Sequence, residues 1–419
     1  MHILDDLAFR GLVHQMTEGL DERLRQGPIT LYNGFDPTSN SMQVGNLVAI
    51  LLLRRFQLAG HTPIALIGGG TGLIGDPSGK SEERTLNAAE TVREWSASFR
   101  RQLEPLLDFE VKTNPARIVD NYAWLGRAPL LDFLRDVGKH FSVPAMLAKE
   151  SVRARLETGI SFTEFSYMLL QAYDFLRLYE DCGCELQTGG SDQWGNITAG
   201  TELIRRAGSR RGAEQRAYGL TCPLVTKADG TKFGKTESGT VWLDAARTTP
   251  YEFYQFWINA DDRNAVDYLK FFTFLDHDAI RDLERAVAAA PERREAQRAL
   301  AREVTTLVHG ASAAQQAENI SQALFSGAVD RLTPAEIEMG FHDVPTYRLE
   351  QESMPLLDLL IAAEVVKSRR QARQDVDSGA IYINGVRCTD TSHVVRRQDG
   401  LHGKYLILRR GKKSYCLVR

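Results

Sequence analysis

Tyr32-Asn-Gly-Phe-Asp-Pro-Thr-Ser-Asn-Ser-Met-Gln-Val-Gly-Asn46 runs from the end of an expected strand into the glycine-containing start of an expected helix. The strand begins at Ile29. Apolar residues at helical spacing follow from Val44, and Gly60 ends the helix. A second strand follows at Thr62–Ile67. Because this alternation continues through residues 28–220, the sequence predicts an α/β domain with a mostly parallel sheet.

Length and composition indicate a globular protein with two or three domains. The 419 residues are too many for one core, and the hydrophobic (43%) and charged (25%) contents are ordinary. Apolar runs stay below the ~18–20 residues that cross a bilayer, and the N-terminus lacks a signal pattern. The five scattered cysteines predict reduced thiols and no metal site. We therefore expect a cytoplasmic protein without a membrane partner.

Two lysines three positions apart lie in Lys232-Phe-Gly-Lys-Thr236, between Ala228-Asp-Gly-Thr and Glu237-Ser-Gly-Thr. The bracketing glycines predict a mobile loop that forms neither helix nor strand. Its two ammonium groups would seek phosphates.

A glycine-rich turn follows the second strand, from Gly68 to Lys80. Gly70-x-Gly72-x-x-Gly75 satisfies a dinucleotide fingerprint on paper, but Pro77 and Gly79 fall where that fingerprint needs a helix. The spacing also misses a phosphate loop by one residue. We interpret the turn as the wall of a small-molecule pocket. Asp76 would present a carboxylate there, and Lys80 and Arg84 would reach toward phosphates.

Polar side chains gather on a helix that starts with Ser161-Phe-Thr-Glu164, a capping-box pattern. Tyr167, Gln171 and Asp174 share one stripe of this helix, and a bound zwitterion and plain solvent explain the stripe about equally well. Gln187-Thr-Gly-Gly-Ser-Asp-Gln-Trp-Gly-Asn196 forms a third strand end and helix start. Ligands of open α/β sheets bind at such strand ends, so we expect the three loops to share one site.

The C-terminal part changes character from Thr249-Pro250, a helix start after which strand signals are absent until beyond Leu324. Two prolines mark residues 327–353 as a linker. From Lys367 onward, 13 Lys and Arg face four Asp, a formal charge of +9 that leaves −12 on the rest of the chain. A hairpin is expected at Asn384-Gly385. A basic terminal module of this kind suits an anion such as RNA, whereas charge alone would fit a solvated surface equally well.

Together these stretches resemble the bacterial tyrosyl-tRNA synthetases, members of the class I aminoacyl-tRNA synthetases, over nearly all of the chain. The resemblance implies a Rossmann-like catalytic domain at 1–220 with a dimer-interface insertion at about 106–152. It further implies an α-helical anticodon-recognition domain with the signature loop at 221–326, a linker at 327–353 and a small α+β RNA-binding module at 354–419. The expected assembly is a homodimer.

The activity implied by the resemblance is that of a tyrosine–tRNA ligase. Such an enzyme activates L-tyrosine with ATP and Mg²⁺ to tyrosyl-adenylate and pyrophosphate, then transfers the tyrosyl group to the 3′ end of tRNA(Tyr), releasing AMP. The expected partners are these three substrates, without DNA, and no cofactor is tightly bound.

Family roles carry over to matching positions. Around tyrosine, the resemblance places Tyr32 and Asp174 at the phenolic hydroxyl, Tyr167, Gln171 and Asp76 at the ammonium group, and Gln193 at the carboxylate. The implied catalytic residues are Lys232, Lys235, Thr38, Gln43, Asn46, Lys80 and Arg84. ATP would contact Gly34, Asp36, Gly45, Gly190, Asp192 and Lys235. The tRNA would contact Lys367, Arg369, Arg370, Arg373, Arg409, Arg410, Lys412 and Lys413.

One departure from the family concerns the helix start, where His-x-Gly-His is replaced by Gln43-Val-Gly45-Asn46. Amide nitrogens can replace the hydrogen bonds of the imidazoles but not the charge of an imidazolium. We expect an active enzyme. The alternatives are an RNA-binding paralogue with weakened catalysis, a synthetase for another aromatic amino acid, and a dinucleotide-dependent oxidoreductase.

Overall fold

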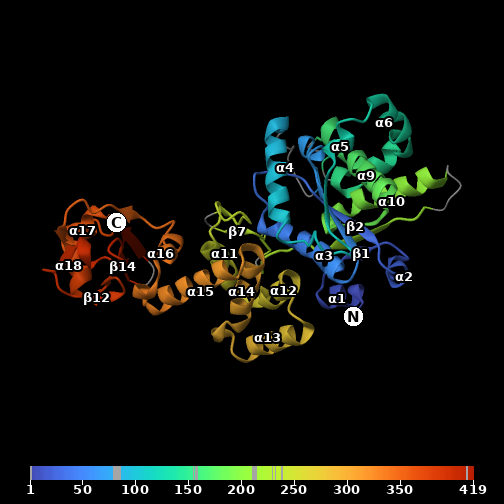
Figure 1. The fold of residues 1–419 in the computed structure, drawn as a ribbon. Coiled ribbons are helices and arrows are strands. Elements are labelled where there is room, and N and C mark those ends of the chain that lie inside the picture. Colours follow the sequence, from blue (N-terminus) through green and yellow to red (C-terminus); the bar gives the residue numbers. More distant parts are fainter. Residues whose placement is uncertain are drawn as a thin grey trace. The chain divides into compact units, whose positions relative to one another are not determined.

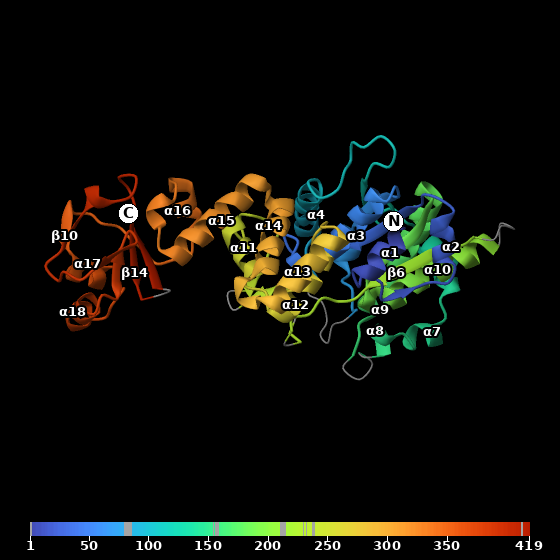
Figure 2. The same cartoon turned by 90° about the horizontal axis from the view of Figure 1, so that it is seen from below.

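The computed structural model describes residues 2–78, 86–153, 155, 159–209, 215–228, 230–231, 233–236, 239–411 and 414–419. The chain divides into two compact units, which are described separately. The first comprises Met1–Thr248 and Ala260–Leu300, and the second comprises Thr249–Asn259 and Ala301–Arg419. This division distributes the expected helical region 221–326 over both units. Figures 1 and 2 show the ribbon from two directions.

A six-stranded sheet in the order β1-β6-β5-β2-β3-β4 forms the centre of the first unit. The edge strand β1 runs antiparallel to β6, whereas the other neighbours are parallel. The strands are β1 (Gln15–Met16), β2 (Thr30–Phe35), β3 (Thr62–Ile67), β4 (Arg117–Asp120), β5 (Cys184–Gly190) and β6 (Tyr218–Cys222). The predicted α/β fold with a mostly parallel sheet is confirmed.

Helices cover both faces of this sheet, with α3 and α4 on one side and α9 and α10 on the other (Figure 1). The central strands are therefore buried on both faces, as their apolar residues predict. The predicted helix after Val44 begins with a 3₁₀ turn at Val44–Asn46 and continues as α3 until the left-handed Gly60 (φ +94°). The main helices of this unit are α1 (Ile3–Phe9), α2 (Leu20–Arg25), α3 (Leu47–Leu58), α4 (Ala89–Leu103), α9 (Phe162–Cys182), α10 (Trp194–Ser209), α12 (Asp262–Phe272) and α13 (His277–Ala289).

Residues 106–152, expected as an insertion, begin with part of the sheet itself, because β4 pairs with β3. Short helices follow: α5 (Tyr122–Leu125), α6 (Leu130–Asp136), α7 (Val143–Leu147) and α8 (Glu150–Arg153). Helix α6 leaves Leu130 and Leu131 largely exposed, at 70% and 78%. An apolar surface of this kind is a candidate protein interface.

The second unit combines helices with a five-stranded sheet in the order β12-β11-β14-β15-β9. Its helices are α11 (Pro250–Ile258), α15 (Ala311–Ser326), α16 (Pro334–Gly340), α17 (Leu356–Ala362) and α18 (Arg369–Asp377), and α14 (Glu295–His309) spans the division between the units. Its strands are β9 (Thr346–Tyr347), β10 (Ser353–Pro355), β11 (Ile381–Ile383), β12 (Val386–Cys388), β13 (Val394–Arg396), β14 (Leu406–Arg410) and β15 (Ser414–Val418). The predicted helix start at Thr249 is a complete capping box with Glu252.

The predicted hairpin is present, since β11 and β12 pair across Asn384 and Gly385, which both have positive φ. Residues 327–353, expected as a linker, contain α16 and a 3₁₀ turn at Val329–Arg331. Apolar residues of this segment, among them Val329 and Ile337, pack in one cluster with Ile407 of β14. The segment is therefore part of the folded unit.

Across the described ranges, every helix is too short or too polar to span a bilayer. All five cysteines are unbridged, as the sequence predicts.

Candidate functional site

Three strand ends of the sheet meet at one edge, as the sequence predicts. Strands β2, β3 and β5 are neighbours and parallel. Asp36, directly after β2, accepts hydrogen bonds from Thr71 in the turn after β3 (2.6 Å) and from Tyr167 of α9 (2.7 Å). Gly68 allows this approach, because a Cβ there would lie 1.9 Å from an Asp36 carboxylate oxygen. The strand ends are thus joined by direct contacts between distant segments.

Two buried oxygen groups, the Tyr32 hydroxyl and the Asp174 carboxyl, lie close to these contacts, because Asn121 donates to both Asp174 and Thr71. Tyr32 of β2 is fully buried, and its hydroxyl has no hydrogen-bond partner among the described residues. Burial raises its pKa well above the usual value, and the charge of Asp174 adds to that rise. An unsatisfied buried hydroxyl costs about 1–3 kcal/mol. The site is therefore suited to a ligand that brings a polar atom to Tyr32.

Asp174 is held by two donors. Its oxygens accept from Asn121 Nδ2 at 2.8 Å and from Trp124 Nε1 at 2.7 Å. Burial raises the pKa of this carboxyl to about 8, although the two hydrogen bonds act to lower it. Asn121 and Trp124 were not predicted from the sequence. The sequence signal for them is Asn-Tyr-Ala-Trp directly after the short run Arg117-Ile-Val-Asp120.

A chain of amides links the turn after β3 with the helix starts after β5. Gln193 donates to Asp76 at 2.7 Å, and Gln171 of α9 lies 3.3 Å from Gln193. Asn196, which was also not predicted as a site residue, donates to Gln171 at 2.9 Å. The structure thus brings the predicted stripe residues Gln171 and Asp174 to one site with Asp76 and Gln193. Such carboxylate and amide groups can bind an ammonium and a carboxylate.

Thr188 stabilises the strand pair that carries this site. Its hydroxyl accepts from Asn33 Nδ2 and donates to the Tyr32 carbonyl, both at 3.1 Å. The sequence alone gave this residue no interpretation, and its role is to join β5 to β2.

The altered helix start forms a compact turn. Asn46 Oδ1 accepts a hydrogen bond from the backbone N–H of Gln43 at 2.9 Å. The side-chain amide nitrogen of Asn46 therefore points away from that N–H group. Gly45 is exposed, with nothing within 4 Å of a Cβ placed there. The turn leads into α3, and the N-terminal end of a helix favours an anion.

The two-lysine loop is described only in part: Lys232 lies outside the described residues, and the side chain of Lys235 is not described. Contrary to the prediction of no strand, Lys235–Thr236 (β7) pairs with Gly239–Thr240 (β8) as a short hairpin. Phe233 is buried against Tyr268 and Phe272 of α12. Gly234 has φ +81° and lies against Val44. A Cβ added at Gly234 would come within 2.8 Å of the Val44 side chain, too close for any residue other than glycine. The loop therefore lies beside the helix start, about 200 positions earlier in the chain.

The remaining predicted residues fall into three groups. Thr38, Gly34 and Asp192 are exposed in the first unit, and Gly190 is half-buried at the end of β5. Lys80, Arg84, Lys412 and Lys413 lie outside the described residues. In the second unit, Lys367, Arg369, Arg370 and Arg373 are exposed at α18, whereas Arg409 stacks on Tyr382 and Arg410 pairs with Asp375.

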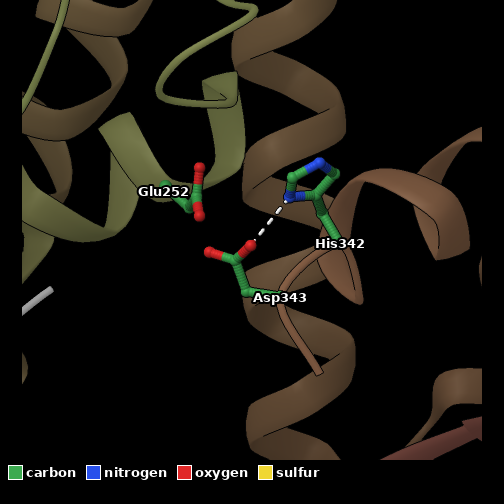
Figure 3. Close-up of side chains that lie close together, drawn as sticks. All are labelled: Glu252, His342 and Asp343. Atoms are coloured by element: carbon green, nitrogen blue, oxygen red, sulfur yellow. Dashed lines mark hydrogen bonds and ion pairs between the residues drawn. The ribbon is translucent and has the colours of Figure 1, made fainter. Parts of the chain in front are cut away.

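The second unit also contains a group of possible metal ligands, Glu252, His342 and Asp343 (Figure 3). Ligand atoms of Glu252, His342 and Asp343 lie within 4.8 Å of one another. His342 is bonded to Asp343 at 2.9 Å, and Glu252 caps its own helix at Thr249. Local turn and cap interactions therefore account for the arrangement.

The chain matches a family model described as tRNA synthetases class I (W and Y) over residues 24–326. It belongs to this family of class I aminoacyl-tRNA synthetases. A second model, the Tyrosine--tRNA ligase SYY-like C-terminal domain, matches residues 336–418.

The similar full-length proteins are named tyrosine–tRNA ligase. The chain is 61% identical to the tyrosine–tRNA ligase of Geobacillus kaustophilus and 60% to that of Geobacillus stearothermophilus, over 100% of both chains in each pair. The solved C-terminally truncated mitochondrial tyrosyl-tRNA synthetase of Aspergillus nidulans is 30% identical, with a TM-score of 0.70, over 77% of this chain and 94% of that one. The resemblance inferred from the motifs is confirmed.

Proposed function

We propose that this protein is a tyrosine–tRNA ligase that forms tyrosyl-adenylate from L-tyrosine and ATP and transfers the tyrosyl group to tRNA(Tyr). The observation that carries the proposal is the buried Tyr32 hydroxyl, without a partner in the described chain, next to the fixed carboxyl of Asp174. A phenolic hydroxyl both donates and accepts, so it can satisfy both groups at once. Phenylalanine would leave them unpaired.

The amino and carboxylate groups of tyrosine fit the amide chain beside this pocket. Asp76 offers a carboxylate to the ammonium group, together with the carbonyl oxygen of Gln171 and the hydroxyl of Tyr167. The Gln193 amide nitrogen, which donates to Asp76, can also donate to a substrate carboxylate. These bonds orient the substrate carboxylate toward the ATP site at the helix start.

Adenylate formation needs no general base, because the attacking carboxylate is already an anion. A carboxylate oxygen forms a bond to the α-phosphorus of ATP while the bond to the bridging oxygen breaks, and pyrophosphate leaves with its electron pair. Positioning and charge neutralisation therefore supply the catalysis. Mg²⁺ enters with ATP as part of the substrate.

The groups that meet the phosphates are assigned by position in the family. Gly45, with Thr38, Gln43 and Asn46, would contact ATP, and Asp192 would bind its ribose. Four cations would neutralise the departing pyrophosphate: Lys80, Arg84, Lys232 and Lys235. In the second step a ribose hydroxyl of the tRNA 3′ end displaces AMP from the carbonyl carbon.

The basic terminal module supplies the surface for tRNA. Exposed Lys367, Arg370 and Arg373 lie on or beside α18, suited to phosphates. The proposed assembly is a homodimer, supported by the exposed leucines of α6. The proposed place of action is the cytoplasm, where tRNA is charged.

The test is exchange of labelled pyrophosphate into ATP. We expect exchange that depends on tyrosine, with phenylalanine and tryptophan giving roughly 10⁴-fold less or lower still, on the order expected when buried polar groups lose a partner. Tyrosyl-tRNA synthetases are themselves the known example of this kind of rejection, so the expected magnitude is that of the family. Absence of exchange with every amino acid, combined with tRNA binding, would instead identify an RNA-binding paralogue.

A further inference from the structure

Both ends of the β7–β8 hairpin are attached to the helix start that we assign to ATP. Gly234, before the hairpin, lies against Val44 and accepts from Val241 N at 2.9 Å. After the hairpin, Val241–Leu243 runs antiparallel to Met42–Val44, and we name this segment the strap. Val44 N donates to Val241 O at 3.0 Å, and Leu243 N donates to Met42 O at 2.9 Å.

The strap is short, so two backbone bonds alone hold it weakly. A side-chain clamp also holds its central residue, Trp242. The guanidinium of Arg247 lies 3.4 Å from the centre of the Trp242 ring and donates to Asn40 Oδ1 at 2.7 Å. One flat cation thus joins the middle of the strap to a residue just before its partner segment.

The partner segment is itself fixed from α4. Gln102 Oε1 accepts from Met42 N at 2.9 Å, and the buried Ser41 hydroxyl lies 3.1 Å from the same oxygen. Asp244 N donates to that hydroxyl at 3.2 Å. Because this partner segment is anchored to α4, the clamp holds the strap against a rigid support.

We propose that Arg247, acting with Asn40, is a positioning residue for adenylate formation: its clamp holds the strap, and the strap fixes the hairpin carrying Lys235 relative to the start of α3. Arg247 itself touches neither tyrosine nor ATP. The inference rests on the proposed function, because it assigns the hairpin to the ATP phosphates. None of the roles carried over from the family includes Arg247, Asn40 or Trp242.

The test compares Arg247→Ala, Arg247→Lys and Asn40→Ala with Arg25→Ala, which removes another exposed arginine that pairs with an aspartate (Asp21, 3.1 Å). Each variant is measured for kcat and KM in tyrosine-dependent pyrophosphate exchange, for tyrosine binding at equilibrium and for Tm. We expect Arg247→Ala to lower kcat about tenfold, as a misplaced catalytic group does, with tyrosine Kd and Tm unchanged. Arg247→Lys should recover part of the loss, since an ammonium can still reach Asn40 and the ring.

The clamp also predicts that the effects of substituting Asn40 and Arg247 on kcat are not independent. Asn40→Ala should lower kcat in the same direction, and the double variant Asn40→Ala/Arg247→Ala should lose little more than Arg247→Ala alone. Unchanged kcat in Arg247→Ala, strictly additive effects, or a parallel loss of tyrosine affinity and Tm would overturn the proposal. Failure of wild-type protein to catalyse exchange would count against the proposed function itself, so the two failures are distinguishable.

Discussion

Trp124 donates its indole N–H to one oxygen of Asp174 at 2.7 Å, while Asn121 donates to the other at 2.8 Å. Both donors come from the segment after β4, whereas Asp174 lies on α9. The carboxyl is therefore fixed in orientation before any ligand arrives. Since the buried Tyr32 hydroxyl nearby has no partner in the described chain, the phenol of tyrosine would, on the proposed function, meet a preformed pair of groups.

Replacing Trp124 by Phe should loosen this carboxyl. The variant keeps most of the ring volume but removes one donor, which costs about 1–1.5 kcal/mol, or roughly tenfold in kcat/KM for tyrosine. The loss for phenylalanine should be smaller, so the preference for tyrosine falls. Kinetics of pyrophosphate exchange with both amino acids measure this. Trp95→Phe on α4 is the control, and an unchanged preference in Trp124→Phe would contradict the assignment.

Because Gln43 and Asn46 replace the signature histidines, we expect the rate of pyrophosphate exchange to show no inflection at the pH where a histidine titrates, about 6.5. Asn46 uses its oxygen to accept from the Gln43 backbone, which leaves an uncharged donor at any pH in this range. The variant Gln43→His/Asn46→His should acquire the inflection in the rate of pyrophosphate exchange. The same inflection in both proteins would show that it comes from another group.

His61 should make the stability of the first unit depend on pH. Burial lowers its pKa from 6.5 to about 4, and its Nδ1 accepts from Ile29 N at 3.1 Å. Between these values the unfolded chain binds a proton that the folded chain does not, so stability falls as pH decreases from about 6.5 to about 4. Urea unfolding at several pH values measures the slope. His61→Gln should flatten it, and a slope equal to that of the wild type would exclude His61 as its source.

The hairpin turn of the terminal module should tolerate only glycine at position 385. Gly385 has φ +84°, and a Cβ there would lie 2.2 Å from the Gly327 carbonyl oxygen. Gly403 has φ +68°, and a Cβ added there would have nothing within 4 Å. The variant Gly403→Ala therefore measures the backbone strain alone, which is about 1–2 kcal/mol. Gly385→Ala should lose roughly 1–3 kcal/mol more through overpacking. Equal melting temperatures for the two variants would contradict the close contact.

Strands and loops of the site were predictable because their signals are local. The β-branched and apolar runs at Ile29 and Thr62–Ile67 predicted β2 and β3. Parallel strands place their ends at one edge of the sheet, so the three loops could be brought together without coordinates. The Asn384-Gly385 turn was likewise predictable, since its positive φ values restrict the residue types.

Contacts between distant segments were not predictable in the same way. The donors Asn121 and Trp124 lie about 50 positions before Asp174, within a stretch without clear periodicity. Arg247 and Asn40 meet across about 200 positions, and nothing in their local sequence signals a partner. The strand at Lys235–Thr236 was missed because the glycines that permit a loop also permit a tight hairpin.

The two-lysine loop beside the helix start is proposed to neutralise pyrophosphate as it leaves, and the proposed catalysis depends on this step. Single-turnover formation of tyrosyl-adenylate by the Lys232→Ala/Lys235→Ala variant tests it most directly, with tyrosine binding measured in parallel. We predict a fall in the rate of at least a hundredfold, on the order found when one preorganised electrostatic group is removed, with tyrosine affinity unchanged. A rate equal to that of the wild-type protein would contradict the account.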